Sequence, residues 1–284
     1  MLDITARTRV AAVIGWPIEH SLSPVIHNAG FRSTGVDAVY VAFPVPPGGA
    51  SDALRAMRHL NLLGLSVTMP HKADMAELVD EVTPSARVLD SVNTVEFRDG
   101  VTTGHSTDGD GFIASLREYG QEVSGRSVTV IGAGAAARAV VDALARYGAA
   151  TVTVVNRTLA AAEAAASLGP HGSRAFDLVD RELVDTAVSS SDIVVNCTSV
   201  GMGAVASTGE TPIDTSVLTP RQVVVDLVYH PVTTPLLRAA ADAGCKAVNG
   251  LGMLVHQAAL QQQIWTGHVP DVADMTAAVR LALG

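Results

Sequence analysis

Short runs of apolar residues, rich in Val and Ile, alternate with segments of helical periodicity along almost the whole chain. The later runs are nearly continuous in apolar residues, which is typical of parallel strands buried on both faces. The predicted strands are Val10–Gly15, Ala38–Val45, Gly64–Met69, Ser91–Phe97, Ser127–Gly132, Thr151–Asn156, Asp192–Cys197 and Val223–Val228. This alternation of strands and helices predicts an α/β fold with parallel sheets.

The segments between the strands carry helix signals and one boundary signal. A helical stripe of apolar residues over Phe112–Tyr119 stops at Gly120, and glycine is a common helix terminator. The polar, glycine-punctuated segment Tyr119–Gly125 predicts a boundary between two domains. The segment Gly201–Thr215 is long and poor in large apolar residues, and loops of that length are often functional or mobile.

Composition narrows the class of protein. The chain has 284 residues, 48% of them hydrophobic and 17% charged, and can bury a sizeable core without disulfides. It has no apolar stretch of about 18 residues, as a membrane span needs, and residues 1–7 lack the order of a secretory signal. The net charge of −9 argues against nucleic acid as a partner. Two cysteines, Cys197 and Cys245, form no framework, so a reducing cytoplasm is expected.

A glycine loop follows the predicted strand Ser127–Ile131 and precedes an Ala-rich helix. Its pattern is G-x-G-x-x-A, in the strand–helix context that the dinucleotide fingerprint requires. Gly132 permits the tight turn, Gly134 lets backbone N–H groups approach a pyrophosphate, and the small Ala137 lets helix and strand pack closely. The helix N-terminus then adds partial positive charge. The loop therefore predicts a dinucleotide site, the alternative being an ordinary tight turn.

The end of the next strand bears on which dinucleotide binds. An NAD site usually has Asp or Glu there, to hold the ribose 2′-hydroxyl, but this chain has Asn156-Arg157-Thr158. The planar donor fork of arginine suits a 2′-phosphate. This favours NADP over NAD, unless Arg157 is simply a solvated loop residue.

Polar side chains gather at strand ends and helix starts in the first 112 residues. Ser21 and Ser23 suit a small anionic or hydroxylated ligand, but helix capping by Ser23 ahead of Pro24 explains one of them. Lys72 follows a buried strand, and strand ends in α/β folds face the ligand crevice, whereas most lysines are solvated. Asn93 occupies a similar place.

The segment Gly104–Gly111 is the last of these polar clusters. A nucleophile elbow would need glycine in place of Asp108. A calcium loop of the EF-hand type starting at Asp108 would need oxygen ligands where Phe112 and Tyr119 stand. A turn with Asp110 near the cap of the next helix is the alternative to a functional Asp108.

Taken together and in order, these clusters resemble the shikimate dehydrogenase family, including its quinate/shikimate relatives, over essentially the whole chain. The resemblance rests on His20–Pro24 with His27 and Asn28, Val67–Lys72, Val92–Thr94, Ser106–Gly109, Gly132–Gly134, Asn156–Thr158, Asn196–Ser199 with Gly201 and Met202, Asp226–Tyr229 with Thr234–Leu236, and Gly250–Leu254 with Gln257.

The resemblance implies an N-terminal α/β substrate domain and a Rossmann-like, doubly wound NADP-binding domain. The first would cover residues 1–112, completed by C-terminal helices at about 250–284, and the second residues 113–249. The implied activity is the reversible, NADPH-dependent reduction of 3-dehydroshikimate to shikimate in the chorismate and aromatic amino-acid pathway. Lys72 and Asp108 would be its acid–base pair, with no metal.

The resemblance also implies two sets of binding residues. The serines would bind the ring carboxylate, and Asn93 and Gln257 the ring hydroxyls. The full substrate set is Ser21, Ser23, Thr68, Asn93, Asp108, Tyr229 and Gln257. The cofactor set is Gly132, Ala133, Gly134, Ala135, Ala136, Asn156, Arg157, Thr158, Leu227 and Gly250.

Three departures from the family pattern leave alternatives open. Ser106 replaces a usual Asn, Ala135 replaces a usual Gly, and Leu159–Ala162 lacks the second basic residue of many NADP-using members. NAD therefore stays possible, and an NAD-using quinate/shikimate or aminoshikimate dehydrogenase is the alternative enzyme. A ligand-sensing Rossmann protein without turnover is the alternative of another class. The expected partners are small molecules only, with no nucleic acid or membrane, for a monomer or homodimer.

Overall fold

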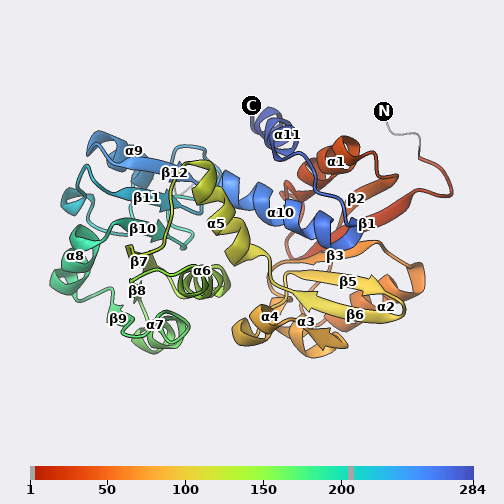
Figure 1. Ribbon diagram of the computed structural model, residues 1–284, viewed down its shortest axis with the longest axis horizontal. Helices are drawn as coiled ribbons and strands as arrows, with labels where there is room; N and C mark the ends of the chain where they lie inside the picture. Colours follow the sequence, from red (N-terminus) through yellow and green to blue (C-terminus); the bar gives the residue numbers. More distant parts are fainter. Residues whose placement is uncertain (1–3, 204–207) are drawn as a thin grey trace. The chain divides into compact units, whose positions relative to one another are not determined.

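The structure is a computed structural model that describes residues 4–203 and 208–284 (Figure 1). The chain divides into two compact units: the first unit is Met1–Thr107 with Val255–Gly284, and the second unit is Asp108–Leu254. Two expectations fall partly outside the described residues. Residues 1–3 belong to the N-terminal segment that lacks a secretory-signal pattern, and residues 204–207 belong to the long loop expected at Gly201–Thr215. No helix within the described ranges is long and apolar enough to cross a membrane.

The first unit contains a six-stranded sheet of order β2-β1-β3-β5-β6-β4. Strand β1 pairs in parallel with β2 and β3, whereas β5 is antiparallel to both β3 and β6. The strands are β1 (Arg9–Gly15), β2 (Ala38–Pro44), β3 (Gly64–Val67), β4 (Glu81–Val82), β5 (Thr94–Arg98) and β6 (Val101–His105).

The expectation of parallel strands is therefore wrong for two of the five strand pairs in this sheet, β3–β5 and β5–β6, and a turn explains the second. Asp99 and Gly100 join β5 to β6, and both have positive φ, 52° and 85°. A two-residue Asp-Gly connection with positive φ at both positions makes a hairpin, which forces its strands to run antiparallel. The pair β5–β6 is thus a local hairpin added to a parallel βαβ core.

Helices cover this sheet and bury its apolar side chains. They are α1 (Ser23–Thr34), α2 (Ala50–Leu60), α3 (Lys72–Leu78), α4 (Pro84–Leu89), the later part of α10 (Leu251–Thr266) and α11 (Val272–Leu283). One core contains Met57, Leu65 and Met75, and a second contains Tyr40 and Trp265. Because Trp265 lies on α10, the far end of the chain is part of the first unit's core.

The second unit contains a six-stranded sheet of order β12-β11-β10-β7-β8-β9, in which every pair is parallel. Strand numbers rise outward in both directions from β7 and β10, as in a doubly wound dinucleotide-binding fold. The strands are β7 (Ser127–Ile131), β8 (Thr151–Asn156), β9 (Arg174–Asp177), β10 (Ile193–Asn196), β11 (Val223–Asp226) and β12 (Lys246–Asn249).

Both faces of this sheet are buried, as its continuous apolar runs predict. Successive residues enter different cores: Val154 packs with Leu144 in one, and Val155 packs with Leu237 in the other. The covering elements are α5 (Asp108–Glu118), α6 (Ala135–Arg146), α7 (Leu159–Ala166), α8 (Arg181–Ser190), the 3₁₀ helix η2 (Thr215–Val217) and α9 (Pro235–Asp242).

Helix α5 belongs wholly to the second unit, because it packs closely on α6. A Cβ atom at Gly109 would lie 2.5 Å from the Ala139 carbonyl oxygen and 2.9 Å from the Ala143 Cβ. The compact units therefore divide at residues 107/108, ahead of the glycine-punctuated segment Tyr119–Gly125, and again at 254/255 within α10.

Candidate functional site

The glycine loop of the second unit has the geometry that a pyrophosphate site requires. Gly132 has φ of 106°, a conformation that side chains disfavour, and its N–H donates to the Val155 carbonyl over 2.8 Å. Gly134 is the N-cap of α6; glycine has no side chain with which to cap the helix, and open space lies where a Cβ would stand. The first N–H groups of α6 are thus accessible to an anion.

Two alanines of the loop fit the same interpretation. Ala135 is the first residue of α6 and is not among the residues with positive φ, so alanine is tolerated where the family often has glycine. Ala137 is fully buried, as expected for the small residue that lets helix and strand approach.

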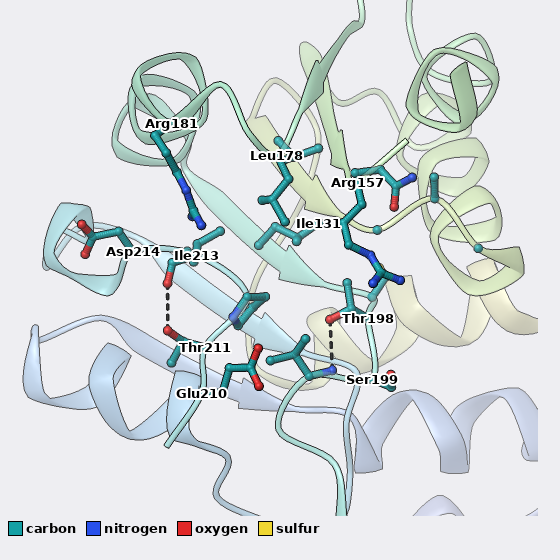
Figure 2. A pocket seen from close by; sticks show the side chains of 18 of the residues that line it. Ile131, Arg157, Leu178, Arg181, Thr198, Ser199, Glu210, Thr211, Ile213 and Asp214 are labelled. Atoms are coloured by element: carbon teal, nitrogen blue, oxygen red, sulfur yellow. Dashed lines mark hydrogen bonds between the residues drawn. The ribbon is translucent and has the colours of Figure 1, made fainter. Parts of the chain in front are cut away.

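A cavity of about 850 Å³ lies at the carboxyl ends of the second unit's central strands (Figure 2). Its lining residues are Ile131, Gly132, Ala133, Gly134, Val155, Asn156, Arg157, Leu178, Arg181, Asp185, Cys197, Thr198, Ser199, Val200, Glu210, Thr211, Pro212, Ile213 and Asp214. The volume is within the range of small-molecule sites. The cavity therefore unites the glycine loop with Asn156 and Arg157, as a dinucleotide site requires.

Arg157 and Arg181 bring positive charge to this cavity. Figure 2 shows the exposed Arg157 side chain running toward Thr198, and Arg181 entering from α8 beyond Leu178. Asp214 lines the same cavity: a backbone hydrogen bond from Ser216 lowers its pKa, and the charge of Arg181 adds to that effect. A guanidinium at the end of β8 suits a phosphate on the ribose.

Several cavity residues carry no sequence signal. Arg181 follows β9, a four-residue strand that the apolar pattern does not reveal, and Glu210–Asp214 return from a loop without a motif. Cys197 also lines the cavity, but burial and the Asp226 carboxylate raise the pKa of its thiol, so it is not a thiolate nucleophile.

The ends of β11 and β12 hold the remaining predicted residues of the second unit. Gly250 lies so close to the Leu227 backbone that any Cβ there would overlap the Leu227 carbonyl. The neighbouring Asp226 is fully buried and accepts hydrogen bonds from Asn196 (2.9 Å) and Thr234 (2.6 Å), although burial raises its pKa. Leu227 and Gly250 do not line the cavity described above. Tyr229 is half-buried, and its burial raises the pKa of its hydroxyl.

In the first unit, the serine pair lies at the start of α1. The prediction that Ser23 is the N-cap is wrong: Leu22 is the N-cap, without a side-chain cap bond, and Ser23 is the first helical residue. The Ser21 hydroxyl instead accepts from the Ser23 N–H over 3.3 Å. Capping by Ser23 therefore does not account for its hydroxyl.

Thr68 and Lys72 follow β3, as the sequence indicates. The Thr68 N–H donates to the Ile14 carbonyl over 3.0 Å, and Gly15 leaves the room that the Thr68 methyl group occupies. Lys72 begins α3, and its carbonyl accepts from the Val92 N–H over 2.9 Å. This bond ties the start of α3 to the segment that carries Asn93.

Asn93 is 3% exposed and belongs to a buried polar cluster. Its Oδ1 accepts from the Thr107 N–H (2.9 Å) and the Thr94 hydroxyl (2.8 Å). Its Nδ2 donates to the Thr107 hydroxyl (3.0 Å) and reaches Gln257 Oε1 (3.5 Å). The structure thus brings Asn93 and Gln257 together from positions 164 residues apart.

Asp108 is the first residue of α5 and is partly buried. It belongs to the second unit, whereas Lys72 belongs to the first. Their role as an acid–base pair stays a prediction. No group of three or more His, Cys, Asp or Glu side chains in the described ranges is arranged to hold a metal ion.

Comparison with known proteins places this geometry in context. Family models match in three consecutive stretches: the shikimate dehydrogenase substrate binding domain at residues 13–95, shikimate / quinate 5-dehydrogenase at 115–228, and the shikimate 5′-dehydrogenase C-terminal domain at 250–280. A curated relative from Geobacter metallireducens, shikimate dehydrogenase (NADP(+)), is 44% identical over 99% of each chain.

Solved structures agree with the sequence relatives. Shikimate 5-dehydrogenase from Listeria monocytogenes, in complex with shikimate and NAD, has a TM-score of 0.92 and 36% identity, covering 98% of this chain and 99% of its own. Shikimate 5-dehydrogenase from Thermus thermophilus, in complex with NADP(H) and shikimate, has a TM-score of 0.88 and 35% identity, covering 97% and 100%.

Proposed function

Because the chain belongs to the shikimate dehydrogenase family, we propose that it catalyses the reversible reduction of 3-dehydroshikimate to shikimate with NADPH. The reaction is a step toward chorismate and the aromatic amino acids. The observation that carries the proposal is the full-length match to relatives of this name, combined with a glycine loop that opens into the cavity beside Asn156 and Arg157.

The second unit holds the cofactor in this proposal. Backbone N–H groups of the loop, residues 132–136, bind the pyrophosphate, and Asn156, Arg157 and Thr158 bind the adenosine end with its 2′-phosphate. Leu227 and Gly250 flank the nicotinamide end. NADPH supplies the hydride, and the chain supplies orientation and proton transfer.

The substrate residues come from both ends of the chain and from Tyr229. Ser21 and Ser23 bind the ring carboxylate, Asn93 and Gln257 bind ring hydroxyls, and Thr68 and Tyr229 complete the substrate set. Lys72 donates the proton to the alkoxide that forms on reduction and accepts it on oxidation, while Asp108 holds the reacting hydroxyl.

A direct assay tests the reaction. Purified protein is mixed with shikimate and either NADP or NAD, and the reduced cofactor is followed by its absorbance. We expect a higher kcat/KM with NADP than with NAD, and with shikimate than with quinate. Tight cofactor binding without any hydride transfer would contradict the proposal and favour the ligand-sensing alternative.

The role of Lys72 has its own test, for which the chain provides a matched control. General acid–base help is worth about 10²–10⁴-fold, so Lys72→Ala should lower kcat by about that factor with little change in cofactor affinity. The only other lysine, Lys246, is exposed on β12 and donates to the Tyr119 carbonyl, and Lys246→Ala should leave kcat unchanged. Normal turnover by the Lys72 variant would contradict the assignment.

Two observations favour a second candidate, an NAD-using quinate/shikimate or aminoshikimate dehydrogenase. The stretch Leu159–Ala162 lacks a second basic residue, and the Listeria relative was crystallised with NAD. The comparison of cofactors and of shikimate with quinate separates the two candidates. We also propose that the protein acts in the cytoplasm, where its free cysteines suit a reducing medium, as a monomer or homodimer.

A further inference from the structure

Three consecutive side-chain contacts, with a fourth that joins from the side, link the buried interior of the first unit to Gln257. They run from Gln262 to His27, from His27 to Gln261, and from Gln261 to Gln257, with Ser66 joining at Gln261. His27, Ser66, Gln261 and Gln262 are each no more than 5% exposed. Because each amide has a donor end and an acceptor end, the chemistry of such a chain fixes how every member is turned.

The orientation of this chain is set by a backbone carbonyl. Gln262 Nε2 lies 2.6 Å from the His27 main-chain oxygen, which is only an acceptor, so this atom is the amide nitrogen. The same nitrogen lies 3.2 Å from His27 Nδ1, which must therefore accept. The neutral imidazole then carries its hydrogen on Nε2 and donates to Gln261 Oε1 over 3.1 Å.

Gln261 passes this orientation to Gln257. Its Oε1 accepts from His27 Nε2 and from the Ser66 hydroxyl (2.6 Å), so its Nε2 is the donor. That nitrogen lies 3.0 Å from Gln257 Oε1 and 3.4 Å from the Asn93 main-chain oxygen, a second obligatory acceptor. The oxygen end of Gln257 is therefore turned toward Gln261, and its nitrogen end points away.

Asn93 favours the same orientation of the Gln257 amide. The Thr107 main-chain N–H donates to Asn93 Oδ1 over 2.9 Å, which identifies the other atom as the donor Nδ2. This nitrogen lies 3.5 Å from Gln257 Oε1. Gln261 Nε2 and Asn93 Nδ2 thus both donate to Gln257 Oε1. In each case, a hydrogen bond with a main-chain group identifies which end of the amide is the donor.

We propose that Gln261 is a positioning residue, which turns the amide nitrogen of Gln257 toward the substrate so that Gln257 donates a hydrogen bond to a substrate oxygen. The inference rests on the proposed function, in which Gln257 binds a ring hydroxyl. Gln261 itself is 2% exposed and acts only through Gln257, its neighbour on the preceding turn of α10.

The test inverts the donor end of Gln261 without changing its shape. Gln261→Glu keeps an acceptor for His27 and Ser66 but offers an oxygen to Gln257, whose amide must then turn over. We expect the KM for shikimate to rise roughly tenfold to a hundredfold, since a misoriented buried polar group is costly. The KM for NADP should stay within about twofold, because the second unit is unaltered.

A matched control and a double-mutant cycle separate positioning from general damage. Gln263→Glu makes the same substitution two residues later on α10, where the side chain is exposed, and should leave the KM for shikimate unchanged. In a Gln257→Ala background the effect of Gln261→Glu on this KM should disappear, because the residue through which it acts is gone.

The wild-type protein, assayed with shikimate and NADP, tests the proposed function by itself. The KM measurements on the Gln261 variants therefore test the positioning role separately. If Gln261→Glu does not fold, Gln261→Met removes the donor without adding charge and leaves Asn93 alone to orient Gln257, so the KM for shikimate should rise by a smaller factor. An unchanged KM for shikimate in a folded variant would overturn the inference. A rise of equal size in the Gln257→Ala background would overturn it as well.

Discussion

The buried histidine of the first unit should make the protein lose stability in mild acid. His27 is completely buried, stacks on Tyr40 with ring centroids 4.0 Å apart, and lies 5.4 Å from the Trp265 ring. Its two ring nitrogens are occupied by Gln261 and Gln262. Burial lowers the pKa of His27 from its ordinary 6.5 to about 3.

The magnitude follows from proton linkage. Between pH 6.5 and 3 the unfolded chain takes up a proton on this imidazole, whereas the folded chain does not. The stabilisation is therefore complete above pH 6.5 and is lost progressively as the pH falls toward 3. One such group removes about 2 kcal/mol from the free energy of unfolding between pH 7 and pH 5.

Urea unfolding followed by tryptophan fluorescence measures this effect, with His27→Gln as the variant and a Gln substitution at the exposed His20 as the control. Comparing each variant with wild type cancels the titration of all other groups. The advantage of wild type over His27→Gln should shrink by about 2 kcal/mol from pH 7 to pH 5, and the control should show no such narrowing. A constant gap across this range would refute the reasoning, because His27 would then titrate alike in both states.

Three further predictions concern packing. Gly250→Ala should weaken NADP binding in calorimetry and lower the urea midpoint, because its Cβ overlaps the Leu227 carbonyl; normal binding would contradict this. Gly64→Ala drives a Cβ into the buried Trp265 ring and should cost about 1–3 kcal/mol in urea unfolding, unlike an exposed Gly→Ala control. Trp265→Phe removes the 3.0 Å bond to the Val95 carbonyl and should cost about 1–3 kcal/mol by circular dichroism; an unchanged midpoint would show that this carbonyl finds another donor.

The long apolar strands were predictable from sequence because burial on both faces leaves a simple signal. All strands predicted from residue 127 onward are present in the second unit's sheet. Strands β9 (Arg174–Asp177) and β12 (Lys246–Asn249), at the two edges of that sheet, escaped prediction. Each has four residues with charged or polar ends, so neither carries an apolar run.

The mixed sheet of the first unit could have been foreseen from one dipeptide. Asp99-Gly100 between two β-rich segments is a strong hairpin signal, and it determines the antiparallel pairing of β5 with β6. The expectation of uniform parallel pairing extended a pattern that holds only for strands joined by helices.

The residues of the candidate site also fall into those that local sequence patterns predict and those that only the tertiary structure reveals. The glycine loop and Arg157 are local features, and the structure brings both to one cavity. The contact between His27 and Gln261 joins positions 234 residues apart, and no spacing rule connects them. Such pairs depend on tertiary packing of α10 in the first unit, which a single sequence does not encode in any local pattern.

The division of the chain into these two units also has a consequence for co-translational folding. The second unit is one uninterrupted stretch, Asp108–Leu254, whereas the first unit needs Val255–Gly284 in addition to the opening residues. During synthesis, the N-terminal part of the first unit therefore cannot complete its core. Its β1 residues and Gly64 stay uncovered until Trp265, which packs against them, has been synthesised. The second unit meanwhile has all of its residues, so the first-made part of this protein is the last to finish folding.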